Sequence, residues 1–236
     1  MRTIALAGIG TTLFMILLFS ALWVLDARKR SAGRLTAGHW SNAAGFGLLP
    51  GFAVWKAFDA FAGNTGNGKL LFQPIRDIPW ITADGRFVPG RIEFCAAVLL
   101  LAGLITWLIV RKKDIPGNGD VLITVLCLWG AVRSVTEGLR SEPPRTGPFS
   151  LVILLAVAAE LICLAVWTVR RGQKQKSAVM TALEWTAVAG CGVLILLQEA
   201  GILSMGSEIA NLAASAGCAL LTAALILSAG RDSREA

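Results

Sequence analysis

Residues 121–143 read VLITVLCLWGAVRSVTEGLRSEP, an apolar run that acquires charge near its end. Residues 121–128 carry no charge, and Arg133, Glu137 and Arg140 then fall within eight residues. Apolar runs of about 20 residues suit a helix that crosses a bilayer core of about 30 Å. The stretch therefore predicts a membrane-spanning helix with a charged stripe at one end.

Similar apolar runs recur along the whole chain. Of its 236 residues, 55% are hydrophobic and 16% are charged, and the mean hydropathy is +0.66. Soluble domains usually carry about 25% charged residues. Lipid offers no partner for free backbone N–H and C=O groups, so such runs must be helical. We expect an all-α polytopic transmembrane helix bundle with about seven spans, near residues 3–25, 36–61, 92–110, 120–139, 149–169, 178–198 and 205–228.

The positive residues predict the orientation of these spans. Thirteen of the 22 lysines and arginines fall on one side of the predicted bundle and seven on the other. Because cytoplasmic loops carry the excess of positive charge, we expect the N-terminus outside and the C-terminus in the cytoplasm. The polar loop at 62–91 is then external. We treat 1–236 as a single integral membrane domain.

The net charge of +7 does not indicate nucleic-acid binding. Lysines and arginines flank the apolar runs instead of forming one basic face with interleaved aromatic residues. The five cysteines all lie inside apolar runs, without a Cys-x-x-Cys spacing. They are expected to be small buried hydrophobic residues, and we predict neither a metal site nor a cofactor.

Several charged residues lie within the predicted spans. Lys56 and Asp59 are three residues apart and share a helix face, and Glu93 opens the third span. Arg133, Glu137 and Arg140 line one stripe of the fourth. An intramembrane charge costs at least about 2.5–3.5 kcal/mol, so such residues face the bundle interior and pair. Two interpretations stay open for the Arg133 stripe: internal salt bridges, or a site for an anionic lipid headgroup whose phosphate fits the arginine fork.

The stretch WGAVRSVTEGLRSEP (129–143) resembles the YG..R...E..R.P signature of the bacterial prolipoprotein diacylglyceryl transferases. Other segments follow the order of motifs in that family. PGFAVWKAFDAFAGNTGNGK (50–69) has the outline of its Gly-Arg-x-Gly-Asn-Phe segment, and PGRIEF (89–94) that of its Pro-x-x-x-Tyr-Glu motif. RKKDIPGNGD (111–120) matches the basic loop before the signature helix. The resemblance covers residues 5–170, and 178–228 form two extra C-terminal spans.

The resemblance implies transfer of a diacylglyceryl group from phosphatidylglycerol to the lipobox cysteine thiol of a secreted preprotein. It places the chain in the bacterial cytoplasmic membrane, with phosphatidylglycerol or another anionic lipid and lipobox preproteins as partners. The site residues that it implies are Arg133 and Glu137 as catalytic, Arg133, Arg140 and Lys56 as phosphate-binding, and Asp59 and Glu93 as supporting.

This sequence also departs from the family pattern. Lys56 replaces an arginine, Asp59 an asparagine and Ile92 a tyrosine, and the histidine of an upstream His-Gly-Gly motif has no counterpart. The single histidine, His39, lies on the predicted cytoplasmic side. These changes leave a second interpretation, a non-catalytic membrane protein of the same fold that binds lipid or another membrane protein. If one lipid site exists, the clusters around Lys56 and Arg133 should converge on a cavity open to the outer leaflet.

Overall fold

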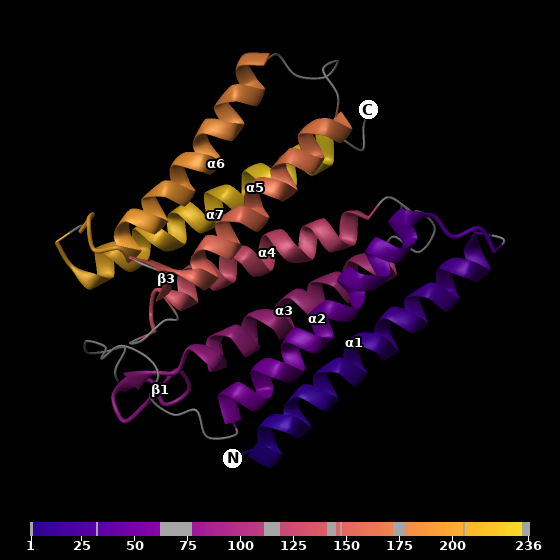
Figure 1. Ribbon diagram of the computed structural model, residues 1–236, viewed down its shortest axis with the longest axis horizontal. Coiled ribbons are helices and arrows are strands. Elements are labelled where there is room, and N and C mark those ends of the chain that lie inside the picture. Colours follow the sequence, from indigo (N-terminus) through magenta and orange to yellow (C-terminus); the bar gives the residue numbers. More distant parts are fainter. Residues whose placement is uncertain are drawn as a thin grey trace. The chain divides into compact units, whose positions relative to one another are not determined.

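The computed structural model describes residues 2–31, 33–61, 77–110, 119–140, 145–146, 148–171, 178–204 and 206–232. Seven α-helices dominate this part of the chain (Figure 1). Two short hairpins, β1–β2 and β3–β4, accompany them. The helices are α1 (Arg2–Arg30), α2 (Ala37–Phe61), α3 (Pro89–Val110), α4 (Asp120–Glu137), α5 (Leu151–Arg171), α6 (Ala178–Glu199) and α7 (Glu208–Asp232).

Five of the helices, α1, α3, α5, α6 and α7, are long and apolar enough to cross a membrane. Side-chain exposure fits that assignment, because large apolar side chains such as Leu99 (71% exposed) and Val169 (81%) face outward. Glutamates such as Glu93 and Glu137 are fully buried. Charged residues within membrane helices normally face the bundle interior and pair there. The chain is therefore a mostly helical protein that is embedded in a membrane.

Each predicted span overlaps a helix, but several boundaries differ from the prediction. The first helix continues past residue 25 to Arg30, where three basic residues lie in its last turn and favour a helix C-terminus. Gly33 then adopts a positive φ of 85°, and its N–H donates to the Arg28 carbonyl at 2.9 Å. This arrangement is a glycine C-cap. The third helix begins at Pro89 rather than residue 92, because proline is well suited to a first helical turn.

The described chain divides into two compact units, Met1–Val125 and Leu126–Ala236. In the first unit, α2 packs against both α1 and α3. Gly47 and Gly51 are four residues apart on α2, and a Cβ on either would collide with Ile16 of α1. A Cβ on Gly45 would lie 2.6 Å from the Leu122 Cα of α4. Small residues at this spacing let membrane helices approach closely.

We expect Gly47→Ala to weaken the packing of α1 on α2. The new methyl group would meet Ser20 and the backbone of Ile16, and overpacking of this kind costs about 1–3 kcal/mol. Thermal unfolding in detergent measures the effect. Gly103→Ala in α3 is the matched control, because its Cβ meets nothing within 4 Å. Equal unfolding temperatures for the two variants would contradict the close contact.

Part of the predicted external loop, residues 62–76, lies outside the described residues, as do 111–118 of the basic loop. Residues 82–87 form the hairpin β1 (Thr82–Ala83) and β2 (Arg86–Phe87). Asp84 and Gly85 have φ angles of 52° and 72°, as a two-residue type I′ turn requires. Arg91 Nη1 donates to the carbonyls of Pro79 and Thr82 at 3.0 Å each, which fixes the segment before the hairpin to the start of α3.

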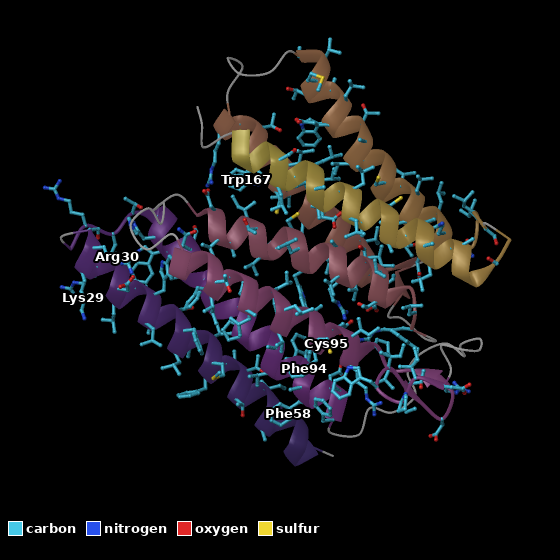
Figure 2. The ribbon with its side chains drawn as sticks, turned by 180° about the vertical axis from the view of Figure 1, so that it is seen from behind. Lys29, Arg30, Phe58, Phe94, Cys95 and Trp167 are labelled. Carbon is cyan, nitrogen blue, oxygen red and sulfur yellow. The ribbon has the colours of Figure 1, made fainter. Side chains whose placement is uncertain are left out.

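Aromatic side chains also attach this segment to the helix. Trp80 Nε1 donates to Cys95 Sγ at 3.2 Å, and the Trp80 ring lies 5.8 Å from that of Phe61. Phe61 in turn contacts Phe94 with ring centroids 5.6 Å apart. Figure 2 labels Phe94 and Cys95 on adjacent positions of α3. The described end of the predicted external loop is therefore held against α2 and α3.

In the second unit, α7 contacts both α5 and α6, and α5 and α6 contact each other (Figure 1). Ile153, Val157 and Ile195 form the buried apolar cluster between α5 and α6. The hairpin β3 (Arg145–Thr146) and β4 (Phe149–Ser150) precedes α5, with Arg145 opposite Ser150. The last two predicted spans thus belong to the helix packing of this unit. Their origin as additions to a 5–170 core, and the single domain over 1–236, remain predictions.

Candidate functional site: two buried charge clusters

Arg133, Glu137 and Arg140 form the first charge cluster, here called the Arg–Glu–Arg cluster, in the second unit. One carboxylate oxygen, Glu137 Oε2, contacts both arginines. It lies 2.8 Å from Arg133 Nη2 and 3.0 Å from Arg140 Nε. The Glu137 side chain is 1% exposed, whereas Arg133 and Arg140 are 15% and 19% exposed. The carboxylate is therefore the buried centre of the cluster, and the arginines reach the surface of the unit.

The end of α4 determines how Arg140 reaches Glu137. The sequence predicts a helix to residue 139, but the α-helix ends at Glu137. A tighter turn follows, in which the Arg140 N–H donates to the Glu137 carbonyl at 3.0 Å and Leu139 N–H to Thr136 at 3.2 Å. Bonds to the third preceding residue commonly tighten the last turn of a helix. Arg140 thus stays beside Glu137 although it lies beyond the regular helix.

The formal charge of the Arg–Glu–Arg cluster is positive. Two guanidinium groups contribute +2 and Glu137 contributes −1. Each planar guanidinium carries five N–H donors in a fork that matches phosphate or carboxylate oxygens. Glu137 contacts one nitrogen of each arginine in the pairs described above. The arrangement holds the two arginines close together on one carboxylate oxygen.

Glu199, at the end of α6, is a further carboxylate near this turn. Its Oε2 atom lies 3.9 Å from the position that a Cβ of Gly138 would occupy. The sequence identifies Glu199 only as a charge near a helix end. No spacing rule relates residue 199 to residue 138, so its approach depends on the packing of the second unit. A bound anion would have to tolerate this carboxylate.

Lys56, Asp59 and Glu93 form the second cluster, here called the lysine cluster, in the first unit. Lys56 Nζ lies 3.1 Å from Asp59 Oδ2 on α2 and also contacts Glu93 Oε2 on α3. The Lys56 side chain is 6% exposed and Glu93 is fully buried. Gly90 allows the close approach, since a Cβ there would lie 3.2 Å from Asp59 Oδ2. The cluster is thus a cross-helix contact between α2 and the first turn of α3.

The formal charge of the lysine cluster is −1, from one ammonium and two carboxylates. The two predicted supporting residues, Asp59 and Glu93, are the ones that contact Lys56. A phosphate brought to Lys56 would meet both carboxylates. The phosphate-binding role of Lys56 stays a prediction, and so does the expected convergence of the two clusters on one cavity.

His39 serves to cap a helix. The Thr36 backbone N–H donates to His39 Nδ1 at 3.1 Å, and the Thr36 hydroxyl lies 2.7 Å from the same nitrogen. The His39 side chain thus accepts from the Thr36 N–H at the start of α2, which is one of the two bonds of a capping box. Within the described ranges, no group of three or more His, Cys, Asp or Glu residues could hold a metal ion.

No protein-family model, curated protein or solved structure matches this chain. The fold and the site define a helical, membrane-embedded protein with five apolar helices and two buried charge clusters.

Proposed function

We propose that this chain binds the phosphate of an anionic lipid at the Arg–Glu–Arg cluster. The observation that carries the proposal is the contact of one buried carboxylate oxygen, Glu137 Oε2, with both Arg133 and Arg140. Arginine forks recognise phosphate through charge-assisted, often bidentate hydrogen bonds. Phosphatidylglycerol, a phosphodiester with one negative charge, is a ligand of suitable chemistry.

The proposed setting is a bacterial cytoplasmic membrane that the chain crosses seven times, with the N-terminus outside. In addition to the five apolar helices, α2 and α4 have 25 and 18 residues. At 1.5 Å per residue, even the shorter is about 27 Å long, close to the thickness of the hydrocarbon core. The basic clusters alternate between the two sides of the membrane only if both α2 and α4 cross it. The Arg–Glu–Arg cluster then lies at the outer end of α4.

The proposed activity is diacylglyceryl transfer from phosphatidylglycerol to a lipobox cysteine, as the resemblance implies. The thiol sulfur forms a C–S bond to the glyceryl carbon, and the C–O bond to the phosphate breaks. Glycerol phosphate leaves with the electron pair, and the thiol loses its proton to a base. Arg133 would stabilise the charge that develops on the phosphate, Glu137 would orient Arg133, and Arg140 would hold the headgroup.

A second candidate is a lipid-binding protein without transfer activity. The contacts of Lys56 favour it, because the positive charge of Lys56 is offset by Asp59 and Glu93. The family pattern has an arginine at this position. Both candidates bind phosphate at the Arg–Glu–Arg cluster, whereas only the first also transfers a diacylglyceryl group.

Genetic complementation tests the transfer activity. The chain is expressed in a bacterial strain that is depleted of its own transferase, and lipidation of a reporter preprotein is followed. We expect rescue by the natural chain and loss of rescue with Arg133→Ala, because removing one donor that stabilises developing charge costs about 10²–10³ in rate. Arg86→Ala, an exposed arginine of β2, is the control that should still rescue.

Direct lipid binding separates the two candidates. The purified protein in detergent is titrated with phosphatidylglycerol and with zwitterionic phosphatidylcholine. Preferential binding of phosphatidylglycerol that Arg133→Ala removes, without rescue, would favour the non-catalytic candidate. Equal affinity for both lipids would overturn phosphate recognition by this cluster.

Glu199→Gln is expected to strengthen binding of phosphatidylglycerol by a few-fold. The change removes a negative charge near the turn at Gly138, and a negative charge there repels a bound phosphate. The same lipid titration measures the affinity. The exposed Asp26, which pairs with Arg30 on α1, provides the control Asp26→Asn, for which no change is expected. Weaker binding by Glu199→Gln would instead make Glu199 a positioning residue for the arginines.

A further inference from the structure

Glu160 differs from the other buried carboxylates described so far. It lies in the middle of α5 and is 2% exposed. Its Oε1 atom has no hydrogen-bond partner, and the described residues provide no ion pair for it. Glu93 and Glu137, buried to the same extent, each contact a cation. Glu160 is therefore a buried acid that the two charge clusters do not explain.

The carboxyl of Glu160 lies in a small site between α4 and α5, here called the Glu160 site. A Cβ on Gly130 of α4 would lie 3.5 Å from Glu160 Oε1 and 3.4 Å from its Cγ, so the glycine leaves room for the carboxyl. Within the described part of the chain, the thiols of Cys127 on α4 and Cys163 on α5 interact electrostatically with it. Thiols are weak hydrogen-bond donors and supply no positive charge. Among the described residues, a charged carboxylate at this position would have no cation beside it, which is costly.

The Glu160 site lies near the Arg–Glu–Arg cluster along α4. Gly130 and Arg133 are three residues apart on α4, so they share a face of the helix. The carboxyl of Glu160 approaches α4 at Gly130, about one helical turn from Arg133 toward the N-terminal end of that helix. The transfer reaction releases one proton for each thiol that is alkylated. The resemblance assigns no residue of this chain as the base that accepts this proton.

We propose that Glu160 is a proton-binding site within the membrane and that it accepts the thiol proton in transfer. The second part rests on the proposed function. In its ionised form Glu160 takes the S–H proton as the C–S bond forms and glycerol phosphate departs. The neutral acid then returns the proton to water before the next cycle. A positioned base that takes a proton during the reaction typically contributes about 10²–10⁴-fold to the rate.

Carbodiimide labelling tests the proton site without any transfer assay. Hydrophobic carbodiimides modify protonated carboxyl groups within membranes, and mass spectrometry locates the adduct on the full chain. We expect modification at Glu160 and not at Glu137, whose carboxylate contacts two arginines. The adduct should be lost in Glu160→Gln and retained in Glu160→Asp. Absence of the Glu160 adduct in natural protein that is folded by circular dichroism would overturn the proposal.

The pH dependence of transfer tests the second part. Glu160→Gln should lower the rate by about 10²–10⁴-fold near neutral pH, with partial recovery at alkaline pH as the thiol ionises by itself. Arg133→Ala should lower the rate at every pH. An unchanged profile for Glu160→Gln would overturn proton acceptance by Glu160 while the labelled site stands. If the natural chain transfers nothing, the proposed function fails, and labelling still decides the proton site.

Discussion

Replacing Glu137 with alanine is expected to abolish lipid binding and to destabilise the second unit strongly. Glu137 Oε2 is the atom that contacts Arg133 at 2.8 Å and Arg140 at 3.0 Å, and the side chain is buried. Removal of one partner from a buried ion pair typically costs about 3–5 kcal/mol, because the remaining charge loses its compensation. Here two guanidinium groups lose the same carboxylate and also their fixed positions.

Thermal unfolding in detergent and titration with phosphatidylglycerol measure the two effects separately. Glu137→Gln keeps the shape and one acceptor oxygen, so its loss of stability should be smaller than that of Glu137→Ala. Asp26→Ala removes an exposed partner of Arg30 and should cost less than about 1 kcal/mol. If Glu137→Ala were as stable as Asp26→Ala, Glu137 would not be the centre of the cluster.

The helices could be predicted from the sequence because the membrane imposes a simple requirement. A span must be a helix of about 20 mostly apolar residues, and five of the helices have that length and composition. The exact ends were less predictable. The extension of α1 to Arg30 depends on the C-cap at Gly33, and the start of α3 on the first-turn position of Pro89. Such ends are determined by individual hydrogen bonds and not by hydropathy.

The candidate site could be predicted only where its contacts are local. Lys56 with Asp59 and Arg133 with Glu137 follow from helical spacings of three and four residues. The contact of Lys56 with Glu93 joins α2 to α3, and its geometry depends on the packing of those helices. The approach of Glu199 to Gly138 likewise depends on tertiary structure. The formal charge of the lysine cluster therefore became evident only when the partners were placed.

The largest loss of stability in the first unit is expected for Lys56→Met. The ammonium is buried between Asp59 and Glu93, and the variant leaves both carboxylates without that charge. As for other buried ion pairs that lose one partner, the free energy of unfolding should fall by about 3–5 kcal/mol. Thermal unfolding in detergent measures it, with Lys29→Met as the control. Lys29 is exposed at the end of α1, as Figure 2 shows, and its loss should be nearly neutral.

A second change should recover much of this stability. Glu93→Gln added to Lys56→Met leaves Asp59 as the remaining charge of the lysine cluster and preserves the side-chain shape of residue 93. A double-mutant cycle then gives the coupling between Lys56 and Glu93, which contacting residues typically show at about 0.5–3 kcal/mol. No recovery would mean that Asp59, and not Glu93, is the main partner of Lys56.

The recovered double variant also separates the structural role of Lys56 from its predicted role in binding phosphate. The net charge of the lysine cluster is −1 before the two changes and −1 after them, so its average attraction for an anion is unchanged. We therefore expect the double variant to bind phosphatidylglycerol through Arg133 and Arg140 with nearly the natural affinity. Loss of binding by a variant that is folded and stable would show that the ammonium of Lys56 itself contacts the lipid, as the resemblance to the transferases implies.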